Sequence, residues 1–256
     1  MSCDLEKQGK VALITINRPK AFNSLDPVTF KEFHDRLVEF RDDPGLWVGI
    51  ITGAGRHALS IGADIKEMLP YLKENRTNPE VMPGTIMRGL AIYKPIIAAV
   101  NGMAIGGGLE IMLACDIRIA SDKARFAVPE VTLGITPGWG GTQRLPRMVP
   151  YCIAAEMMFT GKMIDAQEAY RVGLVNKVVP AEQVMAVAKE MADSICNAAP
   201  LAVRAAKEAM LKGLDMPLDR GLELENRLDA GLMGTKDFGE ALKAHEERRK
   251  PDFKAE

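Results

Sequence analysis

Two glutamates of this chain stand in surroundings that suit acid–base chemistry. Glu110 lies in the apolar run LEIMLAC (109–115), and Glu130 follows Pro129 in FAVPE (126–130). A wholly apolar helix is buried, so a carboxylate within it lies in a pocket or is paired, and burial raises its pKa toward neutrality. A general acid or base requires such a pKa. The simpler alternatives are a solvated surface carboxylate at 110 and a turn cap at 130.

Three consecutive glycines, Gly106, Gly107 and Gly108, separate a strand-like segment (96–100) from the helix-like segment that holds Glu110. Glycines at such a point let the backbone bend sharply and approach a ligand, and their amides lie near a helix N-terminus that favours negative charge. The spacing matches neither GxGxxG nor GxxxxGKS/T, so a phosphate cradle is not indicated. The alternative is tight packing of helix on strand without any ligand.

A second loop, SIGADIKEM (60–68), repeats this arrangement. Gly62 and Ala63 are small, and Asp64 begins a helix-like run as its N-cap or first-turn acid. The functional interpretation is a second backbone N–H aimed at the same anion as Gly107, and the alternative is a plain capped helix start. Amide donors together with two carboxylates are the groups that acid–base chemistry beside a carbonyl needs.

The elements that must position these residues alternate between strand and helix. Strands are predicted at 11–17, 47–52, 96–100, 116–121, 125–129 and 174–180. Helices are predicted from Asp26 and Pro27 to about 42, at 87–94 and 109–115, between Asp165 and Gly173, at 184–195, and near 200–213, 217–232 and 235–248. The first of these helices should bury Phe30, Phe33, Leu37 and Phe40 on one face. Segment 65–76 reads as a helix interrupted by Pro70, and 75–85 as a mobile loop. The alternation predicts an α/β fold with mainly parallel strands and a helical C-terminal quarter.

Composition narrows the function classes. The chain has 256 residues, with 33 basic against 34 acidic side chains and a net charge of −1, so nothing favours nucleic acid or an anionic membrane. The four cysteines (Cys3, Cys115, Cys152, Cys196) and three histidines (His34, His57, His245) show no metal-ligand spacing. The cysteines read as reduced thiols, and no apolar run approaches 18 residues, so a cytoplasmic protein without a metal site is expected.

Taken together, these segments resemble the crotonase (enoyl-CoA hydratase/isomerase) superfamily. The resemblance runs through INRPKAFNSL (16–25), GADIKEM (62–68), KPIIAAVNGMAIGGGLEIMLACDIRIAS (94–121), FAVPEVTLGITPGWGGTQRL (126–145), TGKMIDAQEAYRVGLVNKVV (160–179) and RRKPDFK (248–254). It implies a spiral of repeated ββα units over residues 1–197 and a helical oligomerisation region over 198–256. In the family such C-terminal helices pack subunits into trimers, often dimers of trimers, so the 217–256 segment is expected to face another subunit.

The resemblance also implies roles for individual residues. Ala63 and Gly107 match the two oxyanion-hole amides, and Glu110 and Glu130 match the glutamates that bracket a water in the hydratases, with Gly138 beside that water. Coenzyme A is expected to meet residues of two loops, Lys20, Ala21, Gly62, Asp64, Ile65 and Lys66, and two residues of the C-terminal end, Phe253 and Lys254. No separate cofactor is implied, because coenzyme A arrives as part of the substrate.

The implied activity is hydration of a 2-enoyl-CoA to a 3-hydroxyacyl-CoA, as in fatty acid β-oxidation. Having both glutamates favours a hydratase, because double-bond isomerases of the family commonly keep one acid. The alternatives are another crotonase reaction (hydration of a cyclic enoyl-CoA, dehydration of a specialised hydroxyacyl-CoA, or isomerisation) and a binding protein that lost activity, including RNA-associated members. Leu59, Ile61 and Trp139 depart from the common pattern and are expected to reshape the acyl pocket.

Overall fold

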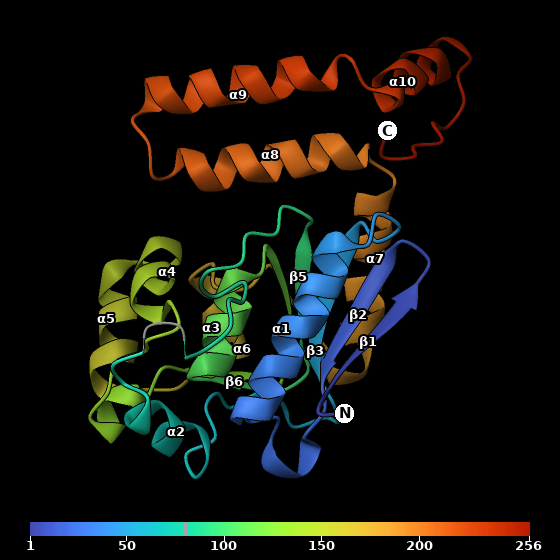
Figure 1. Ribbon diagram of the computed structural model, residues 1–256. Helices are drawn as coiled ribbons and strands as arrows, with labels where there is room; N and C mark the ends of the chain where they lie inside the picture. Colours follow the sequence, from blue (N-terminus) through green and yellow to red (C-terminus); the bar gives the residue numbers. More distant parts are fainter. Residues whose placement is uncertain (79–80) are drawn as a thin grey trace.

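The structure, a computed structural model, describes residues 1–78 and 81–256 and is built on two β-sheets (Figure 1). The six-stranded sheet runs in the order β1 (Cys3–Gln8), β2 (Val11–Ile16), β3 (Val48–Gly53), β5 (Ile96–Val100), β7 (Ile117–Ser121), β10 (Lys177–Val179). The four-stranded sheet runs β4 (Ala58–Ser60), β6 (Met103–Ile105), β8 (Arg125–Ala127), β9 (Ile164–Asp165). All neighbouring strands are parallel except the β1–β2 and β8–β9 pairs.

The chain repeats one unit as it moves along these sheets. In β3–β4, β5–β6 and β7–β8 the first strand of each pair joins the large sheet and the second joins the small one. A helix follows the first two pairs, namely α2 (Met68–Glu74) and α3 (Gly107–Ala114). This is the repeated ββα arrangement that the family resemblance implies, and the α/β fold class is confirmed.

The large sheet is covered on both faces, and alternate side chains of its central strands belong to two different apolar cores. On β5, Ile96, Ala98 and Val100 belong to the main apolar core, whereas Ile97 and Ala99 face a second core under α7 (Val184–Cys196). Successive side chains of a strand point to opposite faces, so a strand covered on both sides is apolar throughout. Strand β5 is therefore packed on both faces, and the short strand β6 leads from it to the three glycines.

Helix α1 (Pro27–Asp42) forms as the sequence predicts. The Asp26 carboxylate accepts a hydrogen bond from the Thr29 amide, and Phe30, Phe33, Leu37 and Phe40 are all buried. The remaining helices are α4 (Gly141–Met148), α5 (Tyr151–Thr160), α6 (Ala166–Arg171), α8 (Pro200–Gly213), α9 (Leu218–Leu232) and α10 (Lys236–Glu246). Three short 3-10 turns, η1 (Pro19–Ala21), η2 (Glu130–Leu133) and η3 (Ala181–Gln183), complete the described elements.

The predicted helical C-terminal quarter is confirmed. Helices α8 and α9 lie side by side at the top of Figure 1 and extend beyond the two sheets. The Lys207 Nζ of α8 lies 2.7 Å from the Asp116 carboxylate and ties the pair to the sheet. The division of the chain at residue 197 stays a prediction.

Two local predictions do not hold as stated, and one strand was not predicted. The expected helix at 87–94 is wrong: Thr85 and Arg88 exchange two backbone hydrogen bonds of 2.7 and 2.9 Å, and Gly89 takes a positive φ of 80°. Pro70 does not interrupt a helix but lies in the first turn of α2, where a missing N–H costs nothing. Strand β1 was not predicted, because its sequence CDLEKQ is polar and only Cys3 is buried. The predicted mobile loop 75–85 includes residues 79–80, which lie outside the described residues.

Candidate active site

A mainly apolar cavity of about 530 Å³ lies at the ends of β4 and β6 and contains both glutamates. Ala63, Gly107, Glu110 and Glu130 all line it. Its apolar walls include Phe22, Ile61, Ile65, Leu69, Leu72, Met103, Ile105, Leu133, Ile135, Trp139 and Met163. The structure thus brings together the two carboxylates and the two amides that the sequence analysis singled out.

Glu110 is the fourth residue of α3, and its side chain is 2% exposed. One carboxylate oxygen, Oε1, accepts hydrogen bonds from the Trp139 and Gly141 amides, each at 2.7 Å. Burial raises the pKa of Glu110 to about 7, and the charge of Glu130 adds to this rise against the two backbone hydrogen bonds. Glu110 can therefore hold or release a proton near neutral pH.

Glu130 opens the turn η2 (Glu130–Leu133) and faces the glycine loop. Its Oε1 lies so close to Gly106 that a Cβ built there would be only 2.7 Å away. Its Oε2 has no hydrogen-bond partner among the described residues, and burial raises the pKa of Glu130. Both carboxyl groups line one cavity, and the charge of Glu130 helps to raise the pKa of Glu110, so the two groups titrate as a coupled pair.

We expect Glu110 to make stability depend on pH. The pKa of its folded-state carboxyl is raised from 4.5 to about 7, so the contribution of this group is fully present below pH 4.5 and is lost as pH rises through 7. A shift of this size corresponds to about 3 kcal/mol in the free energy of unfolding. In calorimetry, Glu110→Gln should therefore raise Tm relative to the native chain by several degrees more at pH 8 than at pH 5.

The control for this measurement is Glu182→Gln, the same change at an exposed carboxylate on η3. It should shift Tm equally at the two pH values. If Glu110→Gln also shifted Tm equally at both, Glu110 would not be the source of the pH dependence.

The amides of Ala63 and Gly107 are available to a ligand. The Leu25 amide donates to the Gly62 carbonyl (2.8 Å) and the Asp64 amide donates to the Leu25 carbonyl (2.9 Å). Ala63 lies between these two bonds, so its own N–H points away from Leu25, as alternate residues of an extended chain do. Gly107 is the first residue of α3, so its N–H has no acceptor within the helix.

Gly62 allows these two amides to lie close together. It adopts φ +84°, and a Cβ built on it would lie 2.5 Å from the Gly107 nitrogen. Only a glycine permits both this backbone conformation and this approach. Neither N–H has a backbone acceptor among the described residues, and two such donors beside an apolar cavity are the arrangement that an oxyanion site requires.

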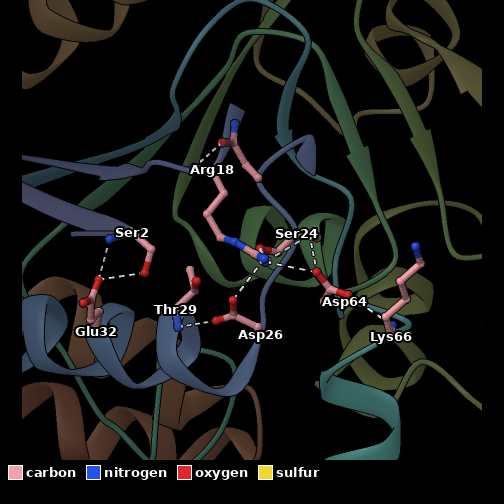
Figure 2. Close-up of polar contacts among 9 residues, drawn as sticks. Ser2, Arg18, Ser24, Asp26, Thr29, Glu32, Asp64 and Lys66 are labelled. Carbon is pink, nitrogen blue, oxygen red and sulfur yellow. Dashed lines mark hydrogen bonds and ion pairs between the residues drawn. The ribbon is translucent and has the colours of Figure 1, made fainter. Parts of the chain in front are cut away.

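Arg18 fixes the loop that carries Ala63 (Figure 2). Its guanidinium lies 3.0 Å from Asp26 and 3.2 Å from Asp64 and also donates to the Ser24 carbonyl at 2.7 Å. The Asp64 carboxylate additionally accepts from the Ser24 hydroxyl (3.1 Å) and the Lys66 amide (3.1 Å). These hydrogen bonds, with the help of Arg18, hold the pKa of Asp64 below its usual value although burial opposes this. The clamp joins the start of α1 to residues 62–66, and the sequence analysis did not single out Arg18.

The residues expected to meet coenzyme A divide into two groups. Gly62, Ile65 and Gly138 lie in or beside the cavity, and Lys20 and Ala21 form η1 directly before Phe22 on its wall. Lys66 is exposed next to Ile65, whereas the Asp64 carboxylate is engaged by Arg18 and Ser24. The structure does not bring the two C-terminal residues, Phe253 and Lys254, to the cavity.

Those last two residues, Phe253 and Lys254, lie on the other side of the large sheet. Phe253 is buried in the second core with Val48 and Ile97, and Lys254 pairs with Asp252. Their contact with coenzyme A stays a prediction, as do the roles of the cavity residues.

Two further observations concern the described residues, 1–78 and 81–256. No three His, Cys, Asp or Glu side chains come together there as metal ligands would. Within the same ranges, no helix combines the length and apolar character needed to cross a membrane.

The chain is similar to known proteins over nearly its whole length. A family model described as enoyl-CoA hydratase/isomerase matches residues 6–256. A short-chain-enoyl-CoA hydratase of Clostridium acetobutylicum is 46% identical over 96% of this chain and 95% of its own length. An (E)-benzylidenesuccinyl-CoA hydratase of Thauera aromatica is 42% identical over 99% of each chain. A crystal structure of an enoyl-CoA hydratase from Bacillus anthracis superposes with a TM-score of 0.91 at 38% identity and covers 100% of both chains.

Proposed function

Because the chain belongs to the enoyl-CoA hydratase/isomerase family, we propose that it hydrates a 2-enoyl-CoA thioester to the 3-hydroxyacyl-CoA. The observation that carries this proposal is the meeting of Glu110, Glu130 and two amides without a backbone acceptor in residues 1–78 and 81–256, all in one apolar cavity. Hydration needs a base for water, an acid for carbon 2 and donors for the thioester oxygen, and this cavity offers all three.

The Ala63 and Gly107 amides are proposed to bind the thioester oxygen. When water adds to carbon 3, electron density moves to that oxygen and gives an enolate-like transition state. Two fixed N–H donors stabilise this charge, and each is worth roughly 3 kcal/mol in comparable oxyanion holes. The apolar walls exclude bulk water, which strengthens both hydrogen bonds.

The glutamate pair is proposed to supply the proton transfers. With one shared proton, the ionised carboxylate removes a proton from water while the neutral carboxyl donates one to carbon 2. The pair ends the reaction with the same proton count, since the base gains the proton that the acid gives away. No redox or metal group takes part in this scheme, and coenzyme A enters only with the substrate.

The proposal is tested with a panel of thioesters and purified protein. Linear 2-enoyl-CoA thioesters of four to ten carbons, a cyclic enoyl-CoA and a 3-enoyl-CoA are supplied in turn, and loss or gain of the conjugated enone absorbance is followed. Fast hydration of at least the four-carbon thioester is expected. Turnover of only the cyclic or the 3-enoyl thioester would assign another reaction of the family, and no turnover with salt-sensitive RNA binding would indicate a binding protein.

We also propose that the chain assembles as a trimer or a dimer of trimers through residues 198–256. A groove runs along α8 and α9. Four large apolar side chains that line it are exposed, namely Met210, Leu214, Leu218 and Leu222. Such a contiguous apolar surface marks an interface with another protein. Sedimentation at micromolar concentration should give the mass of three or six chains, and a monomer would contradict the proposal.

All four cysteines are free thiols, which fits the cytoplasm as the proposed compartment.

A further inference from the structure

We propose that the indole of Trp139 closes the inner end of the acyl pocket and restricts the enzyme to short acyl chains of about four to six carbons. The inference deepens the proposed hydration and rests on it. It names the property that separates substrates within one reaction, namely the length of chain beyond carbon 3.

The Trp139 ring is fixed against the amide edge of the cavity. A Cβ built on Gly107 would lie 2.4 Å from the ring atoms Cε3 and Cζ3, so the ring already touches the Gly107 backbone. The indole also packs against the Phe30 ring, with centroids 5.0 Å apart and planes inclined by 54°. Phe30 is buried in α1, and the Trp139 amide is bonded to Glu110. The Trp139 backbone is therefore held by Glu110, and its ring is held between Gly107 and Phe30 contacts.

Behind the indole lies a second hollow of about 760 Å³. Leu72, Gly138 and Trp139 line both hollows, and Phe30 and Met82 belong only to the second. The Arg88 guanidinium donates to the Gly138 carbonyl at 2.9 Å and holds the loop that carries the ring in place. Trp139 thus stands as a partition between the site of the chemistry and a space large enough for several more methylene groups.

The position of this partition sets the length of chain that fits. A thioester oxygen at the Gly107 amide places the acyl group along the cavity floor, with carbons 2 and 3 facing the glutamates. Leu72, Gly138 and Trp139 line both hollows, so a chain that runs from the glutamates toward the second hollow meets the indole. A rigid aromatic wall rejects longer chains by steric overlap, whereas a small residue at 139 would open the second hollow to them.

The test compares Trp139→Ala and Trp139→Phe with the native chain on linear 2-enoyl-CoA thioesters of four, six, eight and ten carbons. In the native chain, kcat/KM should fall by about 100-fold or more between the four- and ten-carbon substrates. In Trp139→Ala this ratio should shrink to about tenfold or less, and Trp139→Phe should lie between. Phe159→Ala, which trims an aromatic side chain that is 70% exposed on α5 and lines neither hollow, should leave the ratio as in the native chain.

Binding gives a second readout that needs no turnover. Calorimetry with saturated butyryl-CoA and decanoyl-CoA should show preference for the shorter ligand in the native chain and loss of this preference in Trp139→Ala. Equal kcat/KM for four and ten carbons in the native chain, or an unchanged ratio in either folded Trp139 variant, would overturn the inference. If the native chain did not turn over the four-carbon thioester, the proposed function would fail, and the binding comparison would still decide the role of Trp139.

Discussion

Glu110→Gln and Glu130→Gln are each expected to lower kcat for hydration of a four-carbon 2-enoyl-CoA by about 100- to 10,000-fold. Glutamine keeps the shape of the side chain and can still accept the Trp139 and Gly141 amides at position 110. It cannot gain or lose a proton, so one half of the proton exchange is removed in each variant. Affinity for a saturated acyl-CoA, measured by calorimetry, should stay close to that of the native chain.

The control is Glu182→Gln on the exposed turn η3, which should leave kcat unchanged. A double variant, Glu110→Gln with Glu130→Gln, should be only slightly slower than the slower single variant, because residues that act as a unit lose their effect together. Near-normal turnover in either single variant would remove that glutamate from the mechanism. Multiplicative losses in the double variant would instead mean that the two residues act independently.

Local chemistry explains which elements the sequence predicted well. Asp26 and Pro27 define the start of α1 within one helical turn, and the apolar spacing of its four core residues defines the buried face. The segment 87–94 has a similar apolar content, yet it begins with a turn, in which Thr85 exchanges backbone hydrogen bonds with Arg88 and accepts another from the Leu90 amide. Short strands such as β4 and β6 form only because they pair with each other across the chain, and no local pattern announces them.

The residues of the candidate site also differ in how well the sequence alone could predict them. An ionisable residue inside an apolar run predicted the burial of Glu110, whereas Glu130 lacked a comparable local signal and its place depended on family resemblance. The clamp of Arg18 on Asp26 and Asp64 joins residues far apart in the chain, so no spacing rule reveals it. The sequence marks Trp139 only as a bulky residue that departs from the common family pattern. Its contact with Gly107 depends on the tertiary fold.

The proposed oxyanion site requires that residue 62 has no side chain. The Gly107 nitrogen, the Ile105 carbonyl and the Gly107 Cα would lie 2.5, 3.0 and 3.2 Å from a Cβ at this position. All three are backbone atoms of the glycine loop or of β6, so they cannot rotate away as a flexible side chain would. A methyl group here would force the Ala63 loop and the start of α3 apart.

Gly62→Ala is therefore expected to lower kcat by about 100- to 1,000-fold, the cost of losing one oxyanion-hole donor. The matched control is Gly173→Ala, because Gly173 has nearly the same φ of +79° but nothing within 4 Å of the added Cβ. Both variants should lose about 1–2 kcal/mol of stability from the strained left-handed backbone, and Gly62→Ala should lose more because its methyl group also overlaps backbone atoms. Steady-state kinetics should show the large loss of kcat only in Gly62→Ala, since only there does the methyl group displace the Gly107 amide. Equal kcat values in the two variants would mean that the oxyanion site tolerates the displacement, and the pairing of the Ala63 and Gly107 amides on one oxygen would have to be abandoned.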